Sequence, residues 1–259
     1  MGLCSSNETS TKEADFEAAV SATGYGKFHY LLYLAVIPAT WASGFDTSTT
    51  SMIIPSAECD FHLTLFQKGV LNAAVYAGMV SSAFMWGLMA DAFGRKPVVL
   101  YGYLFDGILN VLSGLSQNFY VLLFFKFTCG FVVSGPYASV MTYCAEFHST
   151  KDRPKVTMIL GFFLTAGSIV GAALAFLIIP QNIVFSYNSF YWRSWQIYLS
   201  ACGLPILFGA MSLGLFPESP KFLMSQGKNK KALKVFRKMY AMNFGKSKEA
   251  YPVRKYFKI

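Results

Sequence analysis

The sequence predicts an all-α membrane protein, a bundle of six transmembrane helices followed by a cytoplasmic amphipathic helix. Of its 259 residues, 54% are hydrophobic and 14% are charged, whereas soluble domains carry roughly 25% charged residues. Six apolar stretches are long enough to cross a hydrocarbon core of about 30 Å, which takes roughly 20 helical residues. The basic residues gather between these stretches or in the C-terminal tail, so the net charge of +9 is local and does not indicate nucleic acid.

The apolar stretches divide the chain into three parts. A polar cytoplasmic tail covers residues 1–27, and because it has no apolar core we do not expect a cleavable signal peptide there. The six-span bundle covers residues 28–217, and a cytoplasmic basic helix with its linker covers residues 218–259. The predicted spans lie near residues 29–54, 69–90, 97–116, 119–144, 156–179 and 195–216.

Small residues recur at close spacing in the second, fourth and fifth spans. Small faces let helix backbones approach closely, which is how membrane helices pack without a hydrophobic driving force. We therefore expect tight helix contacts at these positions. They are Ala73, Ala74, Ala77, Gly78, Ser81 and Ser82, then Gly130, Ser134 and Gly135, then Gly161, Gly167, Gly171 and Ala172.

The basic residues also predict the orientation of the bundle. Cytoplasmic loops of membrane proteins carry an excess of lysine and arginine. With the N-terminus in the cytoplasm, Lys68 and Arg193 are the only basic residues outside the membrane on the outer face, and the connections 56–67 and 181–193 face outward. Both termini are then cytoplasmic. The basic residues on that side are Lys12, Lys27, Arg95, Lys96, Lys151, Arg153, Lys155 and the twelve that follow residue 220.

The segment after the sixth span predicts further helix. Ser219 followed by Pro220 is a typical helix start. Farther along, apolar residues at helical spacing alternate with lysines and arginines between residues 228 and 240. This pattern predicts a basic amphipathic helix at the inner membrane surface or against the bundle. Its charges then form either a solvated face or a docking surface.

Two motifs occur at corresponding places after the second and sixth spans. The first, Gly87-Leu88-Met89-Ala90-Asp91-Ala92-Phe93-Gly94-Arg95-Lys96, resembles the signature loop of the major facilitator superfamily. The second, Pro217-Glu218-Ser219-Pro220-Lys221-Phe222-Leu223, is similar to the PESPR-type motif of sugar porters. The resemblance implies the N-terminal six-helix half of a major facilitator fold.

More narrowly, residues 25 to 245 resemble the synaptic vesicle glycoprotein 2 family and related organic-ion and sugar porters. The supporting stretches are Ile54–Glu58, Ala145–Phe147 with Arg153, Ile178–Pro180 and Trp192–Trp195. The chain departs from the family at several positions. The acidic pair of the first span appears as Ser43 and Asp46, the arginine of the fourth span is Lys126, Pro154 follows Arg153, and Ala92 replaces a basic residue.

We expect a charge cluster at the cytoplasmic ends of the even-numbered spans. Asp91, Glu146 and Glu218 each come at a helix C-terminus, where the helix dipole disfavours an anion, so they need cations such as Arg95, Lys96, Arg153 and Lys221. Such a cluster serves either as a gate that forms in one conformation or as a static anchor. The gate and signature-loop candidates are Gly87, Asp91, Gly94, Arg95, Lys96, Glu146, Arg153 and Glu218.

Three ionisable residues lie within the spans, and each is a candidate for substrate binding or ion coupling because a charge inside a membrane is costly. They are Asp46, Asp106 and Lys126. We expect Asp106 to pair with Lys126, which leaves Asp46 free to meet a proton or a cationic solute. Alternatively, Asp46 only hydrogen-bonds Ser43 or Thr47.

The function that best fits is transmembrane transport of a small solute, an organic ion or a sugar-like molecule, by alternating access. A six-helix half supplies one wall of a cavity, so we expect a missing C-terminal half or a second chain, and the sequence fits a truncated form. The alternative is a non-transporting vesicle or membrane protein with a regulatory or trafficking role. The expected partners are the lipid bilayer and the solute, in the plasma membrane or a vesicle membrane.

An enzyme is not expected. The three histidines, His29, His62 and His148, lie apart in the sequence near the predicted membrane edges, without a nucleophile or metal-binding pattern beside them. The five cysteines are scattered without CxxC spacing, which favours neither a disulfide framework nor a zinc site. We therefore expect no catalytic residue, metal or cofactor.

Overall fold

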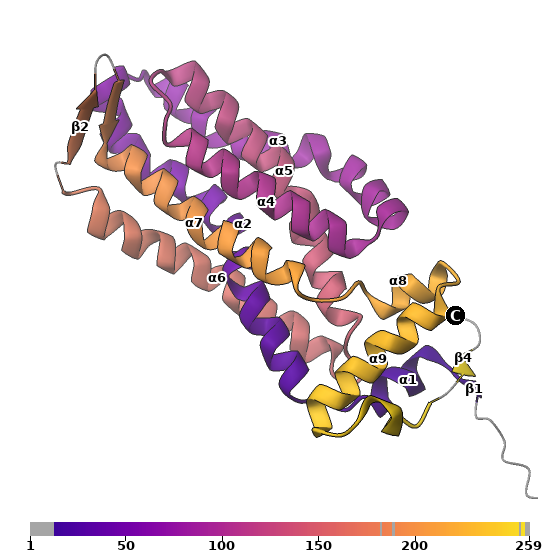
Figure 1. Cartoon of the computed structure of the whole chain (residues 1–259). Coiled ribbons are helices and arrows are strands. Elements are labelled where there is room, and N and C mark those ends of the chain that lie inside the picture. The colour runs from indigo at the N-terminus through magenta and orange to yellow at the C-terminus, as the bar shows by residue number, and fades with distance from the viewer. Residues whose placement is uncertain (1–12, 182, 188–189, 254, 257–259) are drawn as a thin grey trace, which may run out of the picture.

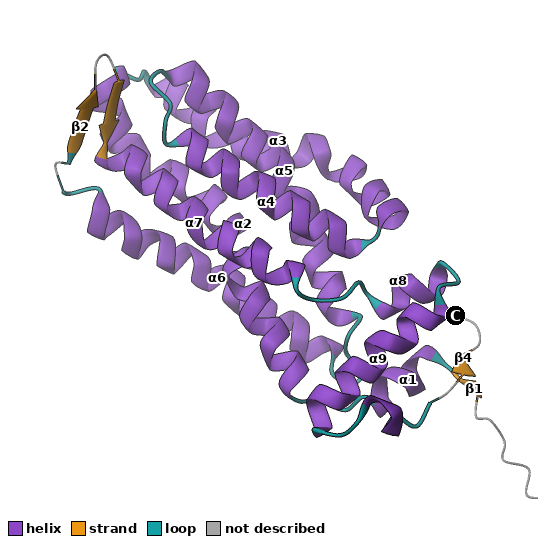
Figure 2. Ribbon diagram, viewed as in Figure 1, coloured by secondary structure: helices purple, strands orange, loops and turns teal. Residues whose placement is uncertain are grey.

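The computed structural model describes residues 13–181, 183–187, 190–253 and 255–256, and these are mainly helical (Figure 1, Figure 2). The first twelve residues of the predicted N-terminal tail lie outside the described residues. Six long helices form a bundle, and each overlaps one predicted span. They are α2 (Lys27–Phe61), α3 (Leu65–Phe93), α4 (Arg95–Ser113), α5 (Phe119–Ala145), α6 (Arg153–Ile178) and α7 (Ser194–Gly214).

The two ends of the bundle carry different smaller elements (Figure 1). At one end, called here the basic end, lie α1 (Phe16–Ala22), α8 (Pro220–Ser225), α9 (Asn229–Phe244) and the short 3-10 helix η1 (Lys248–Ala250). The strands β1 (Glu13–Ala14) and β4 (Lys255–Tyr256) pair in parallel there. At the other end, β2 (Val184–Tyr187) and β3 (Phe190–Arg193) form an antiparallel hairpin, an element that the sequence analysis did not anticipate in the 181–193 connection.

Four of the long helices in the described part of the chain, α3, α5, α6 and α7, are long and apolar enough to cross a membrane. The other two are more polar. Helix α4 begins with Arg95 and Lys96, and α2 carries Glu58 and Asp60 in its last turn. The membrane-type helical fold is therefore established with four candidate spans, and crossing by α2 and α4 stays a prediction.

Glycines set the close contacts between helices, as the small-residue pattern predicts. A Cβ added at Gly78 of α3 would lie 2.2 Å from the Phe127 carbonyl oxygen, and one at Gly130 of α5 would lie 2.0 Å from the Val75 carbonyl oxygen. Larger residues would therefore push α3 and α5 apart. Gly161, by contrast, has open space beside it, so its small size is not required for packing.

Helix α8 begins where the sequence predicts. The Ser219 hydroxyl accepts a hydrogen bond from the Phe222 backbone N–H at 3.2 Å, which satisfies a donor of the first turn. Helix α9 follows and packs on α8. It buries Ala232, Val235, Phe236 and Met239, while most of its lysines are exposed. The helix is thus docked by its apolar side and presents its charges outward.

The N-terminal segment and the C-terminal segment are joined at the basic end. The Asn243 side chain of α9 accepts from the Phe28 backbone N–H at 3.0 Å and donates to the carbonyl oxygens of Thr23 and Gly24, each at 2.9 Å. The Tyr251 hydroxyl donates to the Ala19 carbonyl oxygen at 2.7 Å. These contacts hold α1 and α9 beside the first turn of α2.

Candidate functional site

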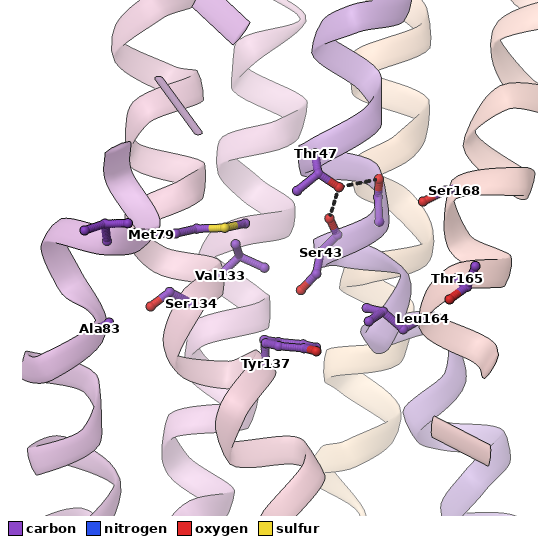
Figure 3. Close-up of a pocket in the computed structure, with 12 residues that line it drawn as sticks. Ser43, Thr47, Met79, Ala83, Val133, Ser134, Tyr137, Leu164, Thr165 and Ser168 are labelled. Atoms are coloured by element: carbon purple, nitrogen blue, oxygen red, sulfur yellow. Dashed lines mark hydrogen bonds between the residues drawn. The ribbon is translucent and has the colours of Figure 1, made fainter. Parts of the chain in front are cut away.

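A cavity of about 560 Å³ lies between α2, α3, α5 and α6 (Figure 3). Half of its lining residues carry a hydroxyl group, and none of the described residues that line it is charged. Such a surface offers hydrogen bonds without an ionic partner. The hydroxyl residues are Ser43, Thr47, Ser134, Tyr137, Thr165 and Ser168, and the others are Gly44, Met79, Val80, Ala83, Val133 and Leu164.

Helical spacing brings these hydroxyls to one cavity. Residues three or four apart share a face of an α-helix. Three helices each supply one such pair to the lining: Ser43 and Thr47 in α2, Ser134 and Tyr137 in α5, Thr165 and Ser168 in α6. The cavity was not predicted from the sequence, although hydroxyl pairs at this spacing on three separate spans were a signal for it.

Two lining hydroxyls already donate within the protein. The Thr47 hydroxyl donates to the Ser43 carbonyl oxygen at 2.8 Å, and the Thr165 hydroxyl donates to the Gly161 carbonyl oxygen at 3.1 Å. The Ser43 hydroxyl is buried without a partner in the described structure. A hydroxyl that donates internally keeps its lone pairs free, so the wall can accept hydrogen bonds from the hydroxyls of a solute.

A buried polar cluster lies on another side of α2, among α2, α4 and α5. It consists of Asp46, Asp106, Asn110 and Lys126, all with no exposed surface. The Asn110 side-chain amide donates to Asp46 Oδ1 at 2.9 Å. The Lys126 ammonium donates to the Thr49 hydroxyl at 3.1 Å and lies close enough to interact electrostatically with both carboxyl groups.

The structure brings all three predicted intramembrane ionisable residues together, but not in the predicted pairing. We expected Asp46 to be without a partner and Asp106 to pair with Lys126. Instead, Asp46 accepts a hydrogen bond from Asn110 and lies near the Asp106 carboxyl group, and the hydrogen bond of Lys126 goes to Thr49. The prediction rested on depth along each helix, and depth does not say which face a side chain occupies.

The polar cluster has acceptors without donors. Within the described residues, Asp46 Oδ2, Asp106 Oδ2 and Asn110 Oδ1 are buried without a hydrogen-bond partner. The two carboxylates and the one ammonium also leave a net negative charge. The Cys129 sulfur and one oxygen of each carboxyl group lie within 4.8 Å of one another, but a metal ion there would face repulsion from Lys126. One proton shared by the two carboxyl groups would satisfy both and balance the charge.

At the basic end, Arg95 forms the centre of an ion-pair network. Its Nε lies 3.2 Å from Glu146 Oε1 and its guanidinium lies 3.8 Å from the exposed Asp91 carboxylate. The Ser219 hydroxyl also donates to Glu146. The helix dipoles disfavour acids at these C-termini, and Arg95 supplies the compensating charge.

Glu218 is held by backbone groups of the same network. Its Oε1 accepts from the Lys96 backbone N–H at 3.1 Å and from the Ser219 backbone N–H at 2.8 Å. Burial raises the pKa of Glu218, although these two hydrogen bonds act in the opposite direction. Gly94 has φ of +100°, and a Cβ there would lie 2.8 Å from Glu218 Oε2. A glycine is therefore required at this turn both for its backbone conformation and for the space it leaves.

Two predicted members of the charge cluster lie outside this network. Arg153 pairs with Glu17 of α1, so its predicted role as the partner of Glu146 and Glu218 is wrong for this conformation. The sequence gives no local signal that α1 folds back over the loop before α6, where Glu17 contacts Arg153 and Thr150. Lys221 is exposed, and no ion pair in the described structure includes it. Gly87 has open space beside it.

Two of the three histidines, His29 and His148, lie side by side, although we expected all three to lie apart. The ring centroids of His29 and His148 are 4.5 Å from each other. The rings are engaged in structural hydrogen bonds: His29 Nε2 with the Phe147 carbonyl oxygen at 3.1 Å, and His148 with the Tyr33 hydroxyl at 2.9 Å and the Cys144 carbonyl oxygen at 2.8 Å. This arrangement leaves His148 no free nitrogen for a ligand.

Comparison with solved structures identifies the fold. The chain matches the partially occluded inward-open conformation of the xylose transporter XylE from E. coli with a TM-score of 0.72 at 19% identity, over 82% of this chain and 55% of that one. It matches the proton:xylose symporter XylE bound to 6-bromo-6-deoxy-D-glucose with a TM-score of 0.69 at 20% identity, over 82% and 50% of the two chains. The latter is a protein of the major facilitator superfamily.

Comparison with curated proteins and family models identifies the family. The chain is 31% identical to synaptic vesicle glycoprotein 2B of Rattus norvegicus over 230 residues, 88% of this chain and 34% of that protein. It is 31% identical to human synaptic vesicle glycoprotein 2C over 245 residues, 93% and 34% of the two chains. It thus spans about a third of the length of these relatives. The model of the sugar (and other) transporter family matches residues 7–254, so the chain belongs to that family, within the major facilitator superfamily.

Proposed function

We propose that this chain forms one half of a transporter that moves a small, uncharged, sugar-like solute across a membrane by alternating access. The observation that carries the proposal is the cavity between α2, α3, α5 and α6, where hydroxyl groups alternate with apolar side chains and no charge is present. A sugar presents hydroxyls and an apolar ring face, which such a wall matches. An organic ion, the other solute class considered from the sequence, would lack a counter-charge there.

The comparisons support this solute class. The family is described as one of sugar (and other) transporters, and a structural neighbour is a xylose symporter that binds a glucose derivative. A six-helix half has one wall of a solute site. The proposal therefore includes a second six-helix half, either C-terminal in a longer protein or on a second chain, that closes the cavity.

In this proposal all six long helices cross the bilayer with the basic end in the cytoplasm. The positive-inside rule supports this orientation, since α9 with its many lysines lies at that end and the hairpin of β2 and β3 lies at the other. The network of Asp91, Arg95, Glu146 and Glu218 then lies at the cytoplasmic surface. There it acts as a gate contact that forms in one state and opens in another, with Gly94 and Lys96 in the turn.

The buried cluster of Asp46, Asp106 and Lys126 is the proposed site of ion coupling, with a proton as the ion. Two observations support a proton. The cluster has two carboxyl groups but one ammonium group, and an oxygen of each carboxyl group is buried without a hydrogen-bond donor in the described structure. A structural neighbour is a proton symporter. The cluster lies next to the solute cavity along α2, since Asp46 falls between Ser43 and Thr47, so protonation there can alter the position of the cavity wall.

Binding to the purified 259-residue chain tests the solute class. We expect radiolabelled monosaccharides to bind and organic cations and anions not to bind. Thr165→Leu should weaken the binding strongly, because it removes a lining hydroxyl and narrows the cavity. Thr157→Leu is a matched control, because Thr157 is also an exposed threonine of α6 that donates to the carbonyl oxygen four residues back but does not line the cavity. Binding of an organic ion that depends on Thr165 would refute the sugar-like class.

Uptake into proteoliposomes tests transport itself. We expect uptake of the bound solute when the chain is combined with a six-helix C-terminal half. The alternative is a regulatory or trafficking protein that keeps the transporter fold, an idea that the names of the vesicle glycoprotein relatives favour only weakly. Solute binding without uptake in the combined protein would support that alternative.

A further inference from the structure

A second cavity, of about 530 Å³, lies between α2, α7 and α9 at the basic end. Its wall is almost entirely apolar. Leu34 of α2, Phe208 of α7 and Leu215, the residue after α7, line it and are each more than half exposed. None of the residues lining this groove lines the solute cavity. An exposed apolar groove on the outside of a membrane-type bundle is a contact surface for hydrocarbon.

One end of this groove carries positive charge. Lys238 of α9 is part of the lining. Lys27 lies one turn before the groove residue Leu31 on the same face of α2. The hydrogen bond from the Phe28 backbone N–H to Asn243 brings the end of α9 beside the start of α2. Both lysines are exposed, and no ion pair in the described structure includes either one.

We propose that this groove binds a glycerophospholipid with an anionic headgroup, its acyl chain along the groove and its phosphate at Lys27 and Lys238. The charge and the shape together favour this ligand. From Leu31 to Pro38 the groove follows α2 for roughly 10 Å toward the middle of the bundle, the direction that an acyl chain takes. In the proposed orientation, the two ammonium groups lie at the level of the headgroups. They attract an anionic headgroup much more strongly than a zwitterionic one, which has no net charge.

Photo-crosslinking in nanodiscs tests this site without any transport assay. The 259-residue chain is placed in phosphatidylcholine nanodiscs that contain a trace of either phosphatidylserine or phosphatidylcholine with a diazirine near the acyl terminus. Mass spectrometry then maps the labelled peptides. We expect phosphatidylserine to label the α2 and α7 segments that line the groove several-fold more than the phosphatidylcholine probe does.

Matched variants assign the headgroup contact. Lys238→Gln should lower the phosphatidylserine label in the groove about fivefold, the effect of one lysine near a membrane surface. Lys231→Gln should leave the label unchanged. Lys231 lies on the same helix, roughly 10 Å before Lys238, and does not line the groove. Ser212→Phe, which fills the groove, should remove the label while circular dichroism shows an unchanged fold.

Two results would overturn the proposal. Equal labelling of the groove by both lipids would mean that it holds ordinary boundary lipid. Equal loss in the Lys238 and Lys231 variants would mean that the basic helix attracts anionic lipid only through its total charge. Neither result would bear on the solute cavity, which lies elsewhere on the bundle.

Discussion

The buried polar cluster in the middle of the bundle and the ion-pair network at the basic end differ in how well their charges are satisfied. At the basic end, Glu146 has Arg95 and the Ser219 hydroxyl, and Glu218 has two backbone N–H donors. In the middle, Asp46 Oδ2 and Asp106 Oδ2 have no donor in the described structure. Burial without a donor is costly, which supports the proposal that the middle cluster takes up a proton, whereas the acids of the network already have donors in the described conformation.

The largest effect should come from removing the only cation of the middle cluster. Lys126→Met leaves two buried carboxyl groups without a counter-charge, so we expect the unfolding free energy to fall by about 3 to 5 kcal/mol. Unfolding of the chain in nanodiscs measures it. Thr49→Val is the control, because it removes only the hydrogen-bond acceptor of Lys126 and should cost about 1 kcal/mol. Similar losses in both variants would show that the charge of Lys126 does not stabilise the cluster.

A second effect should be a loss of stability in acid, caused by a histidine buried at the basic end. Burial lowers the pKa of His148 to about 4 from an ordinary 6.5. Below pH 6.5 the unfolded chain therefore binds a proton that the folded chain does not. The unfolding free energy of the chain therefore has its full value above pH 6.5 and declines as the pH falls to 4, by at most about 3 kcal/mol.

Melting temperatures of the chain between pH 7.5 and 4.5 measure this loss. His148→Asn should reduce the pH dependence. His62→Asn should not, because His62 is exposed, and asparagine tolerates its φ of 50°. An unchanged profile in His148→Asn would show that the acid response of the basic end has another source.

The sequence predicted the helices of this fold far better than the contacts between them. Apolar stretches placed the six long helices, and the Ser219-Pro220 signal placed the start of α8. Motifs also placed Arg95, Glu146 and Glu218 at one end of the bundle. Each of these predictions depends on local sequence, where helix length and end signals act.

Predictions about partners failed where they depended on rotation about a helix axis or on distant segments. Asp46 contacts Asn110 and Asp106 because α2 turns that face toward α4, and depth along the helix does not give the rotation. Arg153 contacts Glu17 because α1 folds back across 136 residues of sequence. The solute cavity draws its lining from four helices, so it requires their packing to be known.

A third prediction sharpens the assignment of the middle cluster as a proton site. Asp46→Asn and Asp106→Asn each remove one negative charge and leave a neutral pair with Lys126. We therefore expect both variants to fold, with unfolding free energies within about 1 kcal/mol of the unmodified chain. Uptake by the chain combined with a C-terminal half should lose its pH dependence in both.

The two variants also separate a shared proton from a single proton carrier. If Asp106→Asn keeps the original pH profile and Asp46→Asn loses it, Asp46 alone carries the proton. If the Asp106 variant instead fails to fold, Asp106 is the structural partner of Lys126, the pairing expected from the sequence.

The smallest effect concerns Arg153, at the rim of the basic end. Its ion pair with Glu17 is partly exposed, with side-chain exposures of 29% and 37%, and exposed pairs contribute only about 0.5 kcal/mol. Burial alone would raise the pKa of Glu17, but hydrogen bonds from Thr150 and the charge of Arg153 outweigh it, so the pKa is lowered from 4.5. The contribution of the pair is therefore present above pH 4.5 and is lost as the pH falls below that value.

Hydrogen exchange of the Arg153→Ala chain measures how far this small effect reaches. We expect the amides of α1 to exchange about twofold faster at neutral pH, which corresponds to about 0.5 kcal/mol, and high salt should abolish the difference. Lys155→Ala, which breaks a neighbouring pair with Asp152, should leave α1 unchanged. Because Glu146 and Glu218 have their own donors, α8 should keep its protection. Faster exchange in α8 would show that Arg153 does neutralise those acids, and the basic end would then be as incompletely satisfied as the middle cluster.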